Sequence, residues 1–179
     1  MFFIAVLPHE ELQERVRKIK LEIRDRYGSG HALNSPAHLT LIPPFYWPIH
    51  QVDDLTGSLD IFCRKEEPFE IRLNNFGAFP PRVIYIDVVK NETLHGLYER
   101  LKFFMAVKWD IRERKGVNKP FNPHMTLAFR DLTKENFKQA WAEYKNKIFS
   151  DDFYVDKIVL LIHQQNHWEI QHHAYFGKK

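Results

Sequence analysis

The sequence has a single cysteine, no long hydrophobic run and little excess of either charge. Because Cys63 is the only cysteine among 179 residues, a scaffold held together by disulfides is excluded. No apolar stretch approaches the roughly 20 residues that a membrane-spanning helix needs. Six apolar residues, Phe2 to Leu7, open the chain and end at Pro8. No basic segment precedes them, so we interpret them as a buried strand and expect a cytoplasmic protein without membrane association.

The remaining composition is that of an ordinary globular protein. Hydrophobic residues account for 44% of the chain and charged residues for 27%, which excludes global disorder. A chain of this length typically forms one domain and buries roughly 70% of its unfolded surface. Lysine and arginine total 26 against 23 aspartates and glutamates, a net charge of +3. This mild excess permits an anionic substrate without requiring one.

Two halves of the chain repeat the order strand, helix, strand, helix, strand. Apolar periodicity predicts helices over 10–27, 51–65, 92–108 and 133–148, and strands over 2–7, 69–76, 83–89, 153–162 and 168–176. Strands predicted over 37–42 and 124–129 occupy the same place in the two halves. This match predicts one domain, 1–179, built from a duplicated unit with approximate two-fold symmetry. Its lobes are residues 1–79 and 80–179, and exchange of terminal strands between them stays open.

Each of the two matched strands contains the motif His-x-Thr. Residues two apart on a strand point to the same face, so His38 lies beside Thr40, and His124 lies beside Thr126. A two-fold relation brings these faces together across a groove. Two imidazoles, with ordinary pKa values of about 6.5, can act as base and acid in phosphodiester cleavage, and two hydroxyls can bind phosphoryl oxygens. The alternative is that both histidines are structural residues of the core.

The segments around both motifs resemble those of the 2H phosphoesterase superfamily. The resembling residues are Pro-Ala-His-Leu-Thr-Leu at 36–41 and Asn-Pro-His-Met-Thr-Leu-Ala at 122–128. The most similar branch is that of the bacterial 2′-5′ RNA ligase-like proteins, which includes RNA 2′,3′-cyclic phosphodiesterases. The resemblance implies an α+β fold in which two antiparallel sheets line a central cleft and helices pack outside. It also implies that both motifs form the active site, with His124 the candidate base and His38 the candidate acid.

One position departs from the pattern of this branch. The second motif often continues as His-x-Thr-Leu-Ala-Arg, whereas here Phe129 stands at the arginine position and Arg130 follows it. If the strand stays regular, Arg130 shares the face of His124 and can reach the phosphate. Arg130 is therefore a phosphate-binding candidate whose role depends on the register of the strand.

Aromatic and basic residues near the motifs are candidates for substrate binding. Phe45 and Tyr46 follow the first motif, and Phe79 and Arg82 precede the strand that opens the second half. They could stack on a nucleobase or contact a phosphate. The alternative for the aromatic residues is packing on the core. The polar, basic loop 110–121 could attract a polynucleotide backbone, or it is simply a solvated loop.

Four histidines near the C-terminus lack the companion ligands and spacing of a metal site. They are His163, His167, His172 and His173. We therefore expect no metal and no cofactor. The function expected is that of a monomeric, metal-independent phosphodiesterase that hydrolyses 2′,3′-cyclic phosphate ends of RNA or nucleotides. One alternative is a 2′-5′ RNA ligase or phosphodiesterase that uses the same groups, and another is a non-catalytic RNA- or nucleotide-binding module.

Overall fold

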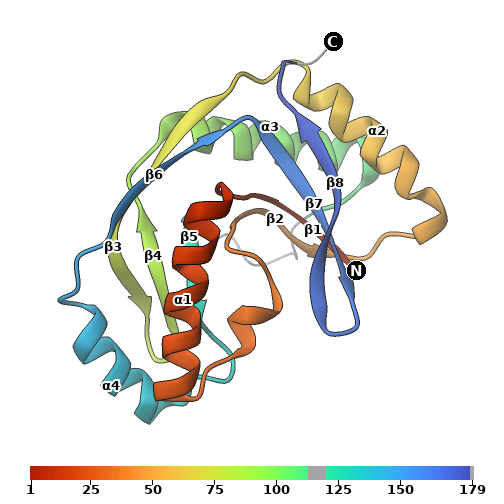
Figure 1. Ribbon diagram of the computed structural model, residues 1–179. Helices are drawn as coiled ribbons and strands as arrows, with labels where there is room; N and C mark the ends of the chain where they lie inside the picture. The colour runs from red at the N-terminus through yellow and green to blue at the C-terminus, as the bar shows by residue number, and fades with distance from the viewer. Residues whose placement is uncertain (113–119, 178–179) are drawn as a thin grey trace.

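The structure is a computed structural model that describes residues 1–112 and 120–177 (Figure 1). Most of the predicted basic loop, residues 113–119, lies outside this range. The strands are β1 (Phe2–Val6), β2 (Leu39–Phe45), β3 (Phe69–Phe79), β4 (Val83–Val88), β5 (His124–Ala128), β6 (Ser150–Val155), β7 (Lys157–Gln164) and β8 (His167–Tyr175). The helices are α1 (Glu10–Tyr27), α2 (Val52–Cys63), α3 (Glu92–Trp109) and α4 (Lys134–Tyr144), with 3₁₀ turns η1 (His31–Asn34) and η2 (Ile49–Gln51).

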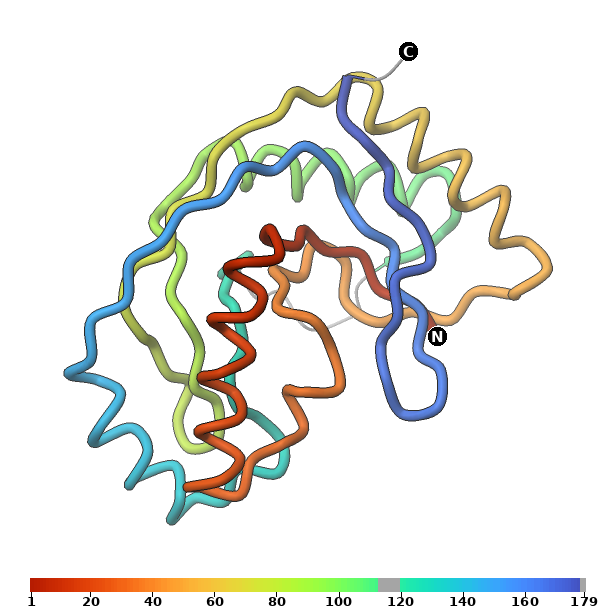
Figure 2. The backbone as a smooth tube through the Cα atoms, in the orientation of Figure 1, coloured from red at the N-terminus to blue at the C-terminus, as the bar shows by residue number. Residues whose placement is uncertain are grey.

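The strands form two four-stranded antiparallel sheets. Sheet A has the order β2-β1-β7-β8, and sheet B has the order β5-β4-β3-β6. The two repeats therefore exchange strands. Strand β3 of the first repeat lies in the sheet that holds β4 and β5, and β7 of the second repeat lies in the sheet that holds β1 and β2. Figure 2 shows the N-terminal strand, in red, running beside the blue C-terminal hairpin. The predicted α+β fold with a duplicated order and two antiparallel sheets is confirmed.

The helices cover the sheets crosswise. Helix α1, which follows a strand of sheet A, packs against β5 of sheet B, and α3, which follows a strand of sheet B, packs against β2 of sheet A. Helix α4 joins α1 over sheet B, while α2 packs against β7 and β8 (Figure 1). The edge strands β2 and β5, which belong to different sheets, lie close to each other. This approach brings the two His-x-Thr motifs together.

The periodicity of α1 gives the buried face that the sequence predicts. The buried apolar side chains of this helix are Leu12, Val16, Ile23 and Tyr27. The side chain of His9 accepts a hydrogen bond from the Leu12 N–H at the start of the helix. Gly28 ends the helix with a φ of 69°, a left-handed conformation that glycine adopts without strain, and its N–H donates to the Arg24 carbonyl.

The single strand predicted over 153–162 is wrong, because it is two strands in different sheets. Asp156 separates β6, which pairs with β3 in sheet B, from β7, which pairs with β1 in sheet A. Apolar residues stand on both sides of Asp156 and Lys157, and no proline or glycine marks the break between the strands. Gln165 and Asn166, between β7 and β8, adopt positive φ values of 45° and 67°.

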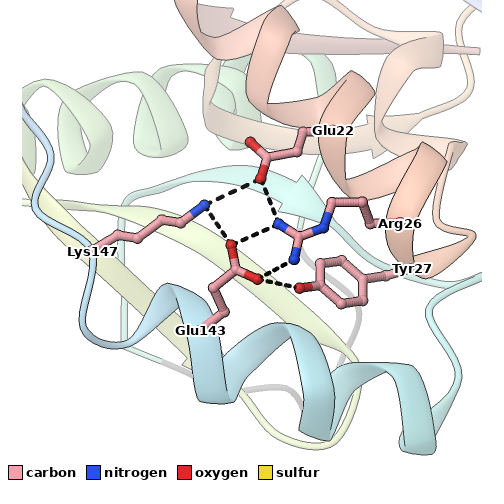
Figure 3. Close-up of polar contacts among 5 residues, drawn as sticks. All are labelled: Glu22, Arg26, Tyr27, Glu143 and Lys147. Atoms are coloured by element: carbon pink, nitrogen blue, oxygen red, sulfur yellow. Dashed lines mark hydrogen bonds and ion pairs between the residues drawn. The ribbon is translucent and has the colours of Figure 1, made fainter.

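An ion-pair network joins α1 to the C-terminal end of α4 (Figure 3). Arg26 contacts Glu143 through both terminal nitrogens, at 2.7 and 2.5 Å, and Glu22 at 2.9 Å. The Tyr27 hydroxyl donates to Glu143 at 2.6 Å, and Lys147 contacts Glu143 at 2.7 Å. Hydrogen bonds from Arg26, Lys147 and Tyr27 hold the pKa of Glu143 well below its usual range. The network links helices that come from the two different repeats.

Strand β1 is buried on both faces. Phe2, Ile4 and Val6 belong to the main core, which includes side chains from both sheets and all four helices. Phe3 and Ala5 point the other way and form a smaller cluster with β7. This smaller cluster forms the floor beneath the first motif, because the rings of Phe3 and His38 are 4.8 Å apart.

Candidate active site

The two motifs lie at the beginnings of the matched edge strands. His38 immediately precedes β2, and Thr40 pairs with Ala5 of β1. His124 is the first residue of β5, and Thr126 pairs with Tyr85 of β4. All four motif side chains are half-buried, which leaves their polar atoms a path to the cleft.

Both imidazoles are held by the same backbone contact. The Nδ1 of His38 lies 2.8 Å from the carbonyl oxygen of Pro36, and the Nδ1 of His124 lies 2.7 Å from that of Asn122. A carbonyl oxygen only accepts, so each Nδ1 carries the hydrogen and donates it. The Nε2 atom of each neutral ring is therefore the one that can accept a proton. Each carbonyl belongs to the residue two before its histidine, so the motifs match in tautomer as well as in sequence.

Burial lowers the pKa of both motif histidines. For His38 the value falls to about 4, since burial outweighs the Pro36 hydrogen bond and the positive charges of Lys20 and His124 add to the fall. The effect of His124 on His38 places the imidazoles within electrostatic reach of each other. Burial also lowers the pKa of His124, against the Asn122 hydrogen bond and the charge of Asp87. Both rings therefore hold a proton less firmly than the ordinary pKa values expected from the sequence imply.

Two cavities flank the motifs and share Thr40 and Pro44. The larger, of about 740 Å³, is lined by His38 and Thr126 together with polar side chains of the loops around them. The smaller, of about 530 Å³, lies on the side of His124 and is lined mainly by prolines, aliphatic and aromatic residues. Each motif histidine therefore faces a different part of one cleft, and Thr40 borders both parts.

Arg130 lines the larger cavity, although the strand does not continue regularly to it. Strand β5 ends at Ala128, and Arg130 has a φ of 60°. Its guanidinium lies over the ring of Phe129, 5.4 Å from the centroid, and donates to the Nε2 of His31 at 3.2 Å. The carboxylate of Asp131 accepts a hydrogen bond from the backbone N–H of His31 at 2.8 Å and so holds the loop that carries His31. The turn after β5 therefore keeps Arg130 beside the cavity, whereas strand periodicity predicts that a regular strand would do so.

The four predicted substrate-binding residues occupy different places. Phe45 lines the smaller cavity, and Tyr46, which is 86% exposed, lines the larger one. The ring of Phe79 contacts that of His124, with centroids 5.0 Å apart. Arg82 is exposed in the turn between β3 and β4, where its N–H donates to the Phe79 carbonyl. Phe45 and Tyr46 therefore border the cleft, and Phe79 contacts His124. Arg82 lines neither cavity.

Several residues around the motifs were missed by the sequence reasoning. The ring of Tyr85 lies 5.1 Å from that of His124, and Asp87 stands opposite His124 in the ladder between β4 and β5. Their spacing of two on a strand was a usable signal, since it places both on one face. Gln13 of α1 clamps the backbone of Ala37 through two hydrogen bonds of 2.7 Å, one to the carbonyl and one from the N–H. No local pattern marks that clamp.

The C-terminal histidines are dispersed. His172 pairs with Asp60 of α2 at 2.8 Å, whereas His163 lines the larger cavity and packs on Trp168. Within residues 1–112 and 120–177, no group of three or more histidine, cysteine, aspartate and glutamate side chains could hold a metal ion. None of the helices in this same part of the chain is long and apolar enough to cross a membrane.

Curated relatives match almost the whole length of the chain. Relatives bearing the name "Putative phosphoesterase" include one from Bacillus cytotoxicus, which is 28% identical over 183 aligned residues that cover 98% of this chain and 96% of the relative. Another, from Bacillus mycoides, is 26% identical over 181 residues with the same coverage.

Solved structures share the fold at lower identity. A Thermus thermophilus protein superposes with a TM-score of 0.70 at 22% identity, covering 98% of this chain and 97% of that one. Escherichia coli LigT, crystallised with 3′-AMP, gives a TM-score of 0.64 at 17% identity, covering 99% of this chain and 98% of LigT. The family model of the 2′-5′ RNA ligase superfamily matches residues 8–167. The chain therefore belongs to the 2′-5′ RNA ligase superfamily, as the resemblance of its two motifs implied.

Proposed function

We propose that the protein is a phosphodiesterase that opens a 2′,3′-cyclic phosphate at the end of RNA or on a nucleotide. The observation that carries this proposal is the matched pair of motifs. Each imidazole is fixed by an Nδ1–H bond to a backbone carbonyl, and each strand carries a threonine two residues later. Membership in the superfamily and relatives named as phosphoesterases support chemistry on a phosphate ester. The 3′-AMP bound by LigT supports a nucleotide substrate.

The reaction uses one histidine on each side of the phosphorus. One neutral imidazole accepts a proton from water at Nε2 while the water oxygen forms a bond to phosphorus. The bond from phosphorus to one ribose oxygen breaks, and the other imidazole, in its protonated form, gives its proton to that oxygen. By family resemblance the phosphate remains on the 2′ oxygen. The hydroxyls of Thr40 and Thr126 donate to the non-bridging oxygens, and Arg130 supplies positive charge at the cavity wall.

The pKa values bear on which histidine plays which part. In the free protein His38, with a pKa of about 4, gives up its proton more readily, which favours it as the base. Burial lowers the pKa of His124 as well, but the charge of Asp87 opposes that fall, which favours His124 as the acid. Family resemblance implies the reverse assignment. An aryl phosphodiester with a nitrophenolate leaving group distinguishes them, because this group departs without a proton: the variant of the acid retains activity on it, and the variant of the base does not.

Incubation with a panel of 2′,3′-cyclic nucleotides, followed by end-group analysis, tests the function. His38→Ala and His124→Ala should each lower turnover by at least about 10², since a general acid or base contributes about 10²–10⁴. The control His173→Ala, at an exposed position on β8, should leave turnover unchanged. Turnover should also survive a chelator. Binding without product would instead support the non-catalytic module, and loss of activity with a chelator, restored by a divalent metal, would contradict the metal-independent mechanism.

The smaller cavity favours one further candidate function. Beyond His124 it offers about 530 Å³, far more than the roughly 30 Å³ that a water molecule occupies. A second ester substituent would fit there, as in a linear 2′-5′ diester that is cleaved or formed by the same groups. Cleavage of a 2′-5′ dinucleotide at a rate comparable to that of the cyclic substrate would support this candidate. A preference of about 10² or more for the cyclic substrate would exclude it as the main activity.

A further inference from the structure

Lys20 is a buried cation directly behind the first motif. It lies on α1 and is only 3% exposed, although lysine is almost never fully buried without partners. Its Nζ donates to the carbonyl oxygen of Ala32 at 2.9 Å and to that of Ser35 at 3.1 Å. Both partners are neutral carbonyls rather than carboxylates, so neither of them cancels the positive charge.

The two carbonyls belong to the segment that leads into His38. Residues 32–34 belong to the 3₁₀ turn η1, Ser35 follows it, and Pro36 and Ala37 connect them to the histidine. Gln13, seven residues before Lys20 and so on the same side of α1, clamps Ala37. Helix α1 therefore holds this segment at two points. Pro36, whose carbonyl receives the Nδ1–H of His38, lies between them.

We propose that Lys20 is a positioning residue for His38, which fixes the segment 32–35 and supplies a buried positive charge behind the imidazole. The catalytic consequence of this arrangement rests on the proposed function. The arrangement itself rests on burial and hydrogen bonds in the free protein. A positive charge at this place opposes protonation of His38, and it also attracts an anionic phosphate toward the motif.

The electrostatic surroundings agree with this role. Burial lowers the pKa of Lys20 to about 8, so the ammonium remains largely charged at neutral pH. Its charge is one of the causes that lower the pKa of His38, together with burial and His124. The other residues with titratable side chains that line the cavity of His38 are His31, Tyr46, Arg130 and His163. On the outer side of Lys20, a cavity of about 420 Å³ is lined by Glu10, Glu14, Arg17 and His167.

Titration of the histidines by NMR in the free protein tests the proposal. Lys20→Gln removes the charge and keeps a hydrogen-bond donor, whereas Lys20→Met removes both. In each variant the titration midpoint of His38 should rise by at least about half a pH unit, while that of His124 stays in place. Lys18→Gln removes a charge from an exposed position on the same helix and should move neither. An unchanged His38 midpoint in a folded Lys20→Gln protein would overturn the proposal.

The wild-type protein offers a second measurement in case both variants fail to fold. The ¹³Cε resonance of Lys20 should titrate near its lowered pKa of about 8, apart from the other lysines. A midpoint above about 10, the range of an exposed lysine, would overturn the buried cation.

Activity separates positioning from a merely structural role. If Lys20 acts through His38, the acid limb of kcat/KM in Lys20→Gln moves to higher pH together with the His38 midpoint. A variant that loses rate equally at every pH would show a structural role only and would contradict the proposal. The NMR titrations need no substrate. A shifted His38 midpoint in a protein that does not hydrolyse cyclic phosphates would refute the proposed function and leave Lys20 in its role.

Discussion

Asp87 stands directly opposite His124 in the ladder between β4 and β5, and its negative charge opposes the fall that burial causes in the pKa of that imidazole. The equivalent charge near His38 is the positive one of Lys20, which lowers the pKa of His38. The two motifs thus match in backbone and tautomer but experience charges of opposite sign. Burial lowers the pKa of both rings, and the nearby charge adds to that fall at His38 but opposes it at His124, so the two similar histidines differ in proton affinity as an acid and a base require.

Replacing Asp87 with asparagine should lower the titration midpoint of His124. The substitution removes the charge that raises the pKa of His124 but keeps an oxygen that can accept from the Val88 N–H. We expect a fall of about half a pH unit, measured by NMR in the free protein. Asp53→Asn, at an exposed position in the first turn of α2, is the matched control. A midpoint of His124 that is the same in both variants would show that the charge of Asp87 does not act on it.

The pH profile of kcat/KM should be bell-shaped with its optimum below pH 6.5. Both motif histidines have a pKa lowered from 6.5 by burial, that of His38 to about 4. The rate rises as the base loses its proton and falls as the acid loses its own, and kcat/KM reports these groups in the free enzyme. The two values belong to the pair, so the expectation holds whichever histidine is the base. An optimum at neutral or alkaline pH would contradict it.

Arg130→Ala should lower kcat/KM by roughly 10- to 100-fold. A hydrogen bond from a charged group contributes about 1.5–3 kcal/mol, and Arg130 is held at the wall of the cavity that His38 lines. His31→Ala should cause a smaller loss, because it removes the acceptor that orients the guanidinium. Arg64→Ala, at the exposed end of α2, controls for the general loss of a positive charge. Equal rates for the Arg64 and Arg130 variants would remove Arg130 from the site.

The network between α1 and α4 should stabilise the protein mainly above pH 4.5. Glu143→Gln should lower the melting temperature by a few degrees at pH 7, because Arg26 and Lys147 lose their shared carboxylate. The folded-state pKa of Glu143 lies below its unfolded value, so its contribution is complete above an unfolded pKa of about 4.3 and is lost as the pH falls below it.

Thermal melts from pH 7 to pH 3 measure this contribution. The difference between wild type and Glu143→Gln should shrink across that range and also at high salt, which screens exposed ion pairs. Glu99→Gln, at an exposed position on α3, should match wild type throughout. A difference that is independent of pH would mean that the side chain acts by packing rather than by charge.

The sequence predicted those features that depend on local pattern. Amphipathic spacing located all four helices, and the matched motifs identified the strands that carry both histidines. The burial of Lys20 could not be predicted from local pattern. A lysine on a helix is expected to be exposed, and only the structure shows that residues 32–35 cover it. The place of Asp87 depends on strand register, since only the pairing of β4 with β5 puts it opposite His124. A regular strand would place Arg130 on the face of His124, but the strand ends two residues before Arg130.

The exchange of third strands between the repeats determines when each sheet can form during synthesis. Sheet B needs only residues 69–155, so its four strands are all present before the C-terminal hairpin has been made. Sheet A places β1 between β2 and β7. On the ribosome the first strand of the protein therefore waits, with one hydrogen-bonding edge unpaired, until residues 157–164 emerge. The first motif lies beside β2 in this sheet, so the sheet next to the first motif is completed only after all four strands of sheet B have been made.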